Sequence, residues 1–108
     1  MSVLIDSEKS GADQPLSNER AAFVESCLAL QMNVHVTDRR ATENYLTDEA
    51  IKKVKGTAFR ALDPFEKFTE LEPRWGKGDN WRIAQNLDLA TLMATDVGRW
   101  LSRLANAP

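Results

Sequence analysis

The sequence predicts an α/β fold in which a pair of parallel strands is followed by a helical half. Residues 2–5 and 34–36 are short runs rich in β-branched side chains, which is typical of buried strands. The segment between them is long enough for one helix, and strand–helix–strand crossovers join parallel strands. Beyond residue 40 the strand signals stop and helix-capping signals recur.

The length and charge of the chain limit its class. Its 108 residues, 43% of them apolar, suffice for one domain with a modest core. We therefore treat residues 1–108 as a single partial domain with a βαβ half at 1–40 and a helical half at 41–108. The 14 basic and 16 acidic residues give a net charge of −2, which offers no global attraction to a polyanion. A nucleic-acid contact would need a local basic cluster.

The first half should contain one helix between the strands. Residues 9–15 are polar, with glycine and proline, and are expected to form a loop. Ser17 can cap a helix that begins near Asn18 and is ended by Asn33. We expect that helix to bury one apolar face, made of Phe23, Val24, Cys27, Leu28 and Leu30.

The second half carries several helix starts. Thr47 can cap a helix that is ended by Gly56. Residues 63–66, Asp-Pro-Phe-Glu, have the order of a second helix start. Asp79 can cap a short helix to residue 87, and Thr95 a last helix. In that last helix the expected apolar stripe is Val97, Trp100, Leu101 and Leu104.

Cysteine content and hydropathy predict a cytoplasmic protein. The single cysteine, Cys27, cannot form an internal disulfide, which fits a reducing compartment, and its apolar neighbours indicate core packing. No apolar run approaches the roughly 18 residues of a membrane span. One cysteine and one histidine fall short of a zinc ligand set. We expect His35, between two valines, to be structural rather than a general base.

Asp6 and Glu8 are the candidate metal ligands. They follow the first strand, and parallel sheets place their ligand sites at that edge. Paired carboxylates two residues apart suit Mg²⁺ or Mn²⁺. Such spacing also occurs by chance in an acidic chain, and Glu70-Leu71-Glu72 is a second instance. A solvated loop therefore remains the alternative.

Cations follow the second strand and recur later in the chain. Arg39 and Arg40 could clamp a phosphate, or one of them could pair with Glu43 and fix the loop. Lys77 lies between two glycines in RWGKGDNWR, where it could neutralise a phosphate or an oxyanion. In the alternative interpretation Lys77 points to water while the tryptophans at 75 and 81 anchor the core.

Three segments, VLIDSE, VHVTDRRATENYL and WGKGDNWRIA, resemble the latter half of a Toprim domain. Such domains are fused to ATPases in overcoming-lysogenization-defect nucleases and related phage-defence proteins. The resemblance covers most of residues 3–104 and implies an endonuclease with Mg²⁺-dependent, two-metal phosphodiester cleavage, of DNA or of RNA. Asp6 and Glu8 match the family's Asp-x-Asp motif, with glutamate in the second position. Arg40 and Glu43 match its Arg/Glu-Asn-Tyr segment, and Lys77 looks like its phosphate-neutralising lysine.

The resemblance also has a gap. The Toprim glutamate that acts as general acid or base belongs to an earlier strand, and no segment here matches it. Two parallel strands also do not make a stable sheet alone. We expect a protein partner or a second copy of the chain to complete the sheet, with nucleic acid as the substrate. The alternative is a non-catalytic interaction module that pairs through its exposed strand edge.

Overall fold

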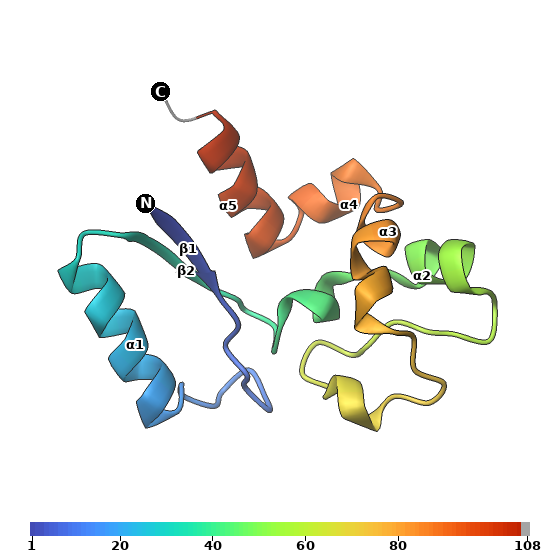
Figure 1. Ribbon diagram of the computed structural model, residues 1–108, viewed down its shortest axis with the longest axis horizontal. Coiled ribbons are helices and arrows are strands. Elements are labelled where there is room, and N and C mark those ends of the chain that lie inside the picture. The colour runs from blue at the N-terminus through green and yellow to red at the C-terminus, as the bar shows by residue number, and fades with distance from the viewer. Residues whose placement is uncertain (107–108) are drawn as a thin grey trace.

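The computed structural model describes residues 1–106, and its first half is a βαβ unit (Figure 1). Strand β1 (Ser2–Ile5) leads through α1 (Asn18–Ala29) to β2 (Asn33–Val36). The two strands are parallel, with Val3 opposite Val34 and Ile5 opposite Val36. The predicted mixed α/β class and the parallel strand pair are therefore confirmed.

Helix α1 begins as predicted and ends early. The Ser17 hydroxyl oxygen accepts a hydrogen bond from the Arg20 amide, so Ser17 is its N-cap. The helix ends at Ala29 instead of continuing to Asn33. Gln31 adopts a left-handed φ of 60°, which turns the chain into β2 and stops the helix there.

Helices α1 and α5 (Asp96–Ala105) lie on opposite sides of the strand pair (Figure 1). On the α5 side, the His35 ring stacks on Trp100 with ring centroids 5.7 Å apart. On α1 only Cys27 is buried, as expected for core packing. Val24 is half-buried, but the prediction is wrong for the other three side chains of the face, because a two-stranded sheet covers only a narrow stripe of the helix. Phe23, Leu28 and Leu30 remain 51%, 56% and 75% exposed.

The main hydrophobic core lies in the second half, away from the sheet. It forms around α2 (Asp48–Lys55), α3 (Asn80–Ala84) and the long connection between them. Helix α4 (Leu89–Met93) then leads to α5, and short 3-10 turns span Thr42–Tyr45, Phe68–Glu70 and Lys77–Asp79. The buried residues of this core are Leu46, Ala50, Ile51, Leu62, Leu71, Trp75 and Ile83.

Two of the predicted N-caps in this half are confirmed. The Thr47 hydroxyl accepts from the Ala50 amide at the start of α2, and the Thr95 hydroxyl accepts from the Gly98 amide at the start of α5. Gly56 ends α2 with φ of 109°, a conformation that favours glycine.

The helix predicted to start at residues 63–66 is absent. The Asp63 amide does donate to the Glu66 carboxylate, as in a capping box. However, the Asn44 side chain donates to the carbonyls of Asp63 and Glu66, 2.9 Å each, so an outside donor occupies these two carbonyls.

Within residues 1–106, no helix has the length and apolar composition needed to span a bilayer.

Candidate functional site

A cavity at the carboxyl end of the strands brings the five predicted site residues together. We call it the strand-end cavity, and its volume is about 200 Å³. Lys67, Phe68 and Thr69 also line it, and sequence reasoning did not single out any of these three. The predicted residues on its wall are Asp6, Glu8, Arg40, Glu43 and Lys77.

Asp6 is a half-buried carboxylate on this wall. It follows β1 directly, and one of its oxygens accepts from the Thr42 amide at 3.1 Å. Burial raises the pKa of Asp6, and the neighbouring Glu43 charge raises it further. A cation bound in the strand-end cavity would lower this pKa and favour the ionised form of Asp6.

Glu8 is held by cations from other elements. Its carboxylate pairs with the Arg20 guanidinium on α1 at 2.7 Å and is 53% exposed. Its backbone adopts φ of 56°, and its amide donates to the Arg40 carbonyl at 2.7 Å. The loop after β1 is thereby joined both to α1 and to the loop after β2.

The two arginines after β2 bind backbone carbonyls. Arg40 Nη1 donates to the carbonyls of Glu8 and Lys9, at 2.8 and 3.2 Å. Arg39 Nη1 donates to the Asn44 carbonyl at 2.9 Å. The alternative in which an arginine pairs with Glu43 is wrong, because neither arginine forms an ion pair with Glu43 within residues 1–106 and the Glu43 carboxylate pairs with Lys77 instead.

Glu43 pairs with Lys77 across the strand-end cavity. The Glu43 carboxylate and the Lys77 ammonium are 3.3 Å apart, and the ammonium lies 5.3 Å from the centroid of the Phe68 ring. Glu43 is 12% exposed while Lys77 is 63% exposed. A largely but not fully buried carboxylate thus positions a lysine that remains open to solvent. Of the two flanking tryptophans, Trp75 is buried in the core and Trp81 is exposed.

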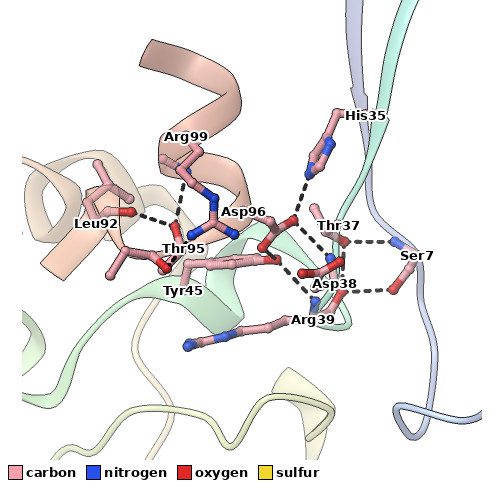
Figure 2. Close-up of polar contacts among 12 residues, drawn as sticks. Ser7, His35, Thr37, Asp38, Arg39, Tyr45, Leu92, Thr95, Asp96 and Arg99 are labelled. Carbon is pink, nitrogen blue, oxygen red and sulfur yellow. Dashed lines mark hydrogen bonds and ion pairs between the residues drawn. The ribbon is translucent and has the colours of Figure 1, made fainter. Parts of the chain in front are cut away.

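Buried hydroxyl groups fix the two strand-end loops to each other (Figure 2). The Ser7 amide donates to the Thr37 hydroxyl oxygen at 3.0 Å, and the Ser7 hydroxyl donates to the Arg39 carbonyl at 2.8 Å. The Thr37 hydroxyl donates to the same carbonyl at 2.7 Å. Because Ser7 separates Asp6 from Glu8, these bonds set where the two carboxylates lie.

Asp96 joins α5 to the same region (Figure 2). Its carboxylate accepts from the Tyr45 hydroxyl at 2.6 Å and from the Asp38 amide at 3.1 Å, and it lies 2.7 Å from His35 Nε2. Burial alone would raise the pKa of Asp96, but the bonds from Tyr45, His35 and Asp38 lower it. Burial and the neighbouring Asp96 raise the pKa of Tyr45. His35 therefore has a structural contact, as the sequence predicts.

The metal-ligand set of the chain is incomplete. Within the described residues 1–106, no three His, Cys, Asp or Glu side chains gather closely enough to hold a metal ion. Glu8 is paired with Arg20, and Glu43 with Lys77, which leaves Asp6 as the cavity carboxylate without an ion pair in that range. With one unpaired carboxylate on the cavity wall, we expect these residues by themselves to hold a divalent cation only weakly.

Comparison with known proteins gives no relative for this chain. No protein-family model, curated protein or solved structure matches it. The assignment of function therefore rests on the strand-end cavity and its residues.

Proposed function

We propose that the chain is a Toprim-like, nuclease-derived domain that supplies part of a Mg²⁺-dependent phosphodiester-cleaving centre. The remaining strands and a general acid or base glutamate would come from outside this sequence. One observation carries the proposal: the five residues chosen from sequence, spread between positions 6 and 77, line one cavity at the carboxyl end of parallel strands. That edge is where open α/β sheets bind their ligands.

The chain's own side chains fit the positioning part of this chemistry. Asp6 offers a carboxylate to a cation, and Lys77, held by Glu43, offers an exposed ammonium to a phosphate oxygen. Arg40 uses Nη1 for loop carbonyls, which leaves its remaining N–H groups for a phosphate. Because the described residues do not complete a metal site, we assign no reaction step to the metal.

The need for a partner follows from the sheet and from α1. The sheet has two strands, both of them edges, and such edges invite pairing with another strand. The exposed apolar side chains Phe23 and Leu28 lie on α1, which packs beside this sheet, and exposed Leu30 is the C-cap of that helix. We propose that a protein partner or a second copy completes the sheet and covers part of this helix.

Metal binding tests the proposal directly. In a Mn²⁺ titration followed by NMR, paramagnetic broadening should centre on the amides of Asp6, Thr42 and Glu43. Asp6→Asn should abolish it, because the one cavity carboxylate without an ion pair among residues 1–106 is then neutral. Asp13→Asn is the matched control, since Asp13 is exposed and does not line the strand-end cavity. Equal broadening in Asp6→Asn and the parent protein would contradict the proposal.

Plasmid nicking in Mn²⁺ gives the second measurement. Any nicking by the chain, alone or with a partner, should be lost in Asp6→Ala and lowered in Lys77→Gln. An Asp6→Ala protein that nicks as fast as the parent protein would exclude a nuclease centre here.

A non-catalytic interaction module is the second candidate, and the exposed apolar side chains of α1 favour it. It requires no metal at Asp6 but does require an oligomer or a captured strand. Light scattering and hydrogen exchange separate the two candidates from a self-sufficient domain. A folded monomer with strongly protected β1 amides would argue against any obligatory partner.

A further inference from the structure

A second cavity adjoins the strand-end cavity, and we call it the lysine cavity. It has a volume of about 280 Å³ and lies between the loop after β1 and the start of α1. Glu8, Arg40 and Lys67 line both cavities, so the two share a wall. Lys9, Ser10 and Gln14 line the lysine cavity alone.

The two cavities differ in charge. The strand-end cavity has three cations, Arg40, Lys67 and Lys77, against three carboxylates, so its wall is neutral. The lysine cavity has Lys9, Arg40 and Lys67 against one carboxylate, Glu8. Since Glu8 is already paired with Arg20 at 2.7 Å, the wall of the lysine cavity is clearly cationic.

Two of the three cations of the lysine cavity, Lys9 and Lys67, have no partner within the described residues, whereas Arg40 donates to loop carbonyls. Among residues 1–106, the Lys9 and Lys67 ammonium groups form no ion pair, and neither donates a side-chain hydrogen bond. Lys77, by contrast, is paired with Glu43. Two unpaired ammonium groups on one concave wall are available to an anion.

Neutral donors also line this cavity. The Gln14 Oε1 accepts from the Ser10 amide at 2.6 Å, which fixes the side-chain amide so that its Nε2 remains a donor. The Ser10 hydroxyl lies on the same wall. Point-charge lysines together with amide and hydroxyl donors are typical of phosphate recognition.

We propose that the lysine cavity binds a phosphate group of the substrate strand, next to the phosphate held in the strand-end cavity. This inference rests on the proposed function in naming the substrate as a phosphodiester strand, although phosphate binding itself needs no metal. Lys67 and Arg40 line both cavities. Both side chains would therefore contact the strand where it passes from one cavity to the other.

Metal-free NMR titrations with inorganic phosphate and with a ten-residue oligothymidylate test the inference. Both probes should shift the amides of residues 7–10 and 14, and the oligothymidylate should also shift residues of the strand-end cavity. Lys9→Gln and Lys67→Gln should each raise the dissociation constant about five-fold, and the double variant should lose binding. Lys53→Gln, an exposed lysine of α2 outside both cavities, should bind as the parent protein does. Unchanged spectra elsewhere report intact folding.

The outcomes separate this inference from the proposed function. Equal phosphate affinity in the parent, Lys9→Gln and Lys67→Gln proteins would overturn phosphate binding in the lysine cavity, independently of the result of the Mn²⁺ titration. So would phosphate-induced shifts confined to other parts of the chain. If free phosphate binds but the oligothymidylate does not, the assignment of the ligand as a nucleic-acid strand is overturned. Phosphate binding that persists in Asp6→Asn supports the lysine cavity. It does so even if Asp6→Asn leaves the Mn²⁺ broadening unchanged, a result that would contradict the proposed nuclease centre.

Discussion

Removal of the Asp96 carboxylate should be one of the most destabilising single changes in the protein. Asp96 is 10% exposed and is the common acceptor for groups of three segments: the Tyr45 hydroxyl, the Asp38 amide and the His35 ring. These contacts join α5 to β2 and to the loop that carries Arg40. Asp96→Ala deletes all three at once (Figure 2).

The magnitude follows from which partners are shielded from water. Hydrogen bonds to a charged group contribute about 1.5–3 kcal/mol each. The bonds from Tyr45 and His35 are partly buried and count in full, whereas water can replace the bond from the exposed Asp38 amide. The two shielded bonds give a loss of about 3–6 kcal/mol, a large share of the roughly 5–15 kcal/mol that stabilises a typical domain.

Urea unfolding at pH 7, followed by tryptophan fluorescence, measures this loss. Tyr45→Phe removes the bond to Asp96 and also the bond that the Tyr45 oxygen accepts from the Arg39 amide, and it should cost less than Asp96→Ala because the His35 contact remains. Asp13→Ala, at an exposed position, is the control and should leave the free energy of unfolding unchanged. A loss below about 1 kcal/mol in Asp96→Ala would refute the reasoning, because the carboxylate would then not be a structural acceptor.

The same carboxylate predicts a dependence on pH. The pKa of Asp96 is lowered in the folded protein, so the native state favours the ionised form. Its contribution is therefore present above the ordinary aspartate pKa of about 3.9 and is lost as the pH falls through the lowered folded value. The difference in stability between the parent protein and Asp96→Ala should shrink in that acidic range. A constant difference down to pH 2 would contradict the assignment.

Two further substitutions test the packing and the surface charges. A Cβ on Gly98 would lie 1.9 Å from the Leu92 carbonyl oxygen, so Gly98→Ala should lower stability by about 2 kcal/mol or more in thermal unfolding, whereas Gly78→Ala, with open space, should not. Equal melting temperatures would contradict this. The Arg60 guanidinium lowers the pKa of Glu66 to about 2, so its contribution is present above pH 4.5 and is lost toward pH 2. The urea midpoint should therefore fall less steeply over that range in Glu66→Gln than in the parent protein.

Local signals predicted most of the elements correctly. Ser17, Thr47 and Thr95 each cap a helix, because the cap bond joins a side chain to an amide only three residues away. The segment at 63–66 failed for a long-range reason. Its capping bond forms, but Asn44, some twenty positions earlier, occupies the carbonyls of Asp63 and Glu66.

The candidate site also combines residues that local patterns predicted with a residue that they did not. The sequence placed Asp6, Glu8 and Arg40 at one edge, because residues that follow parallel strands meet there. It also singled out Lys77 from its glycine-flanked loop. It did not single out Lys67, since no local pattern distinguishes that lysine from the chain's other surface lysines.

By itself the sequence determined the βαβ unit, the helix caps and the residues that can carry chemistry at the strand ends. Only the tertiary structure decided which of these residues pair. Glu43 binds Lys77 and not an arginine, Arg40 binds the carbonyls of the neighbouring loop, and Lys67 lies on the wall between two cavities. Such choices depend on the paths of connections about thirty residues long, which long-range packing fixes and short-range patterns do not encode.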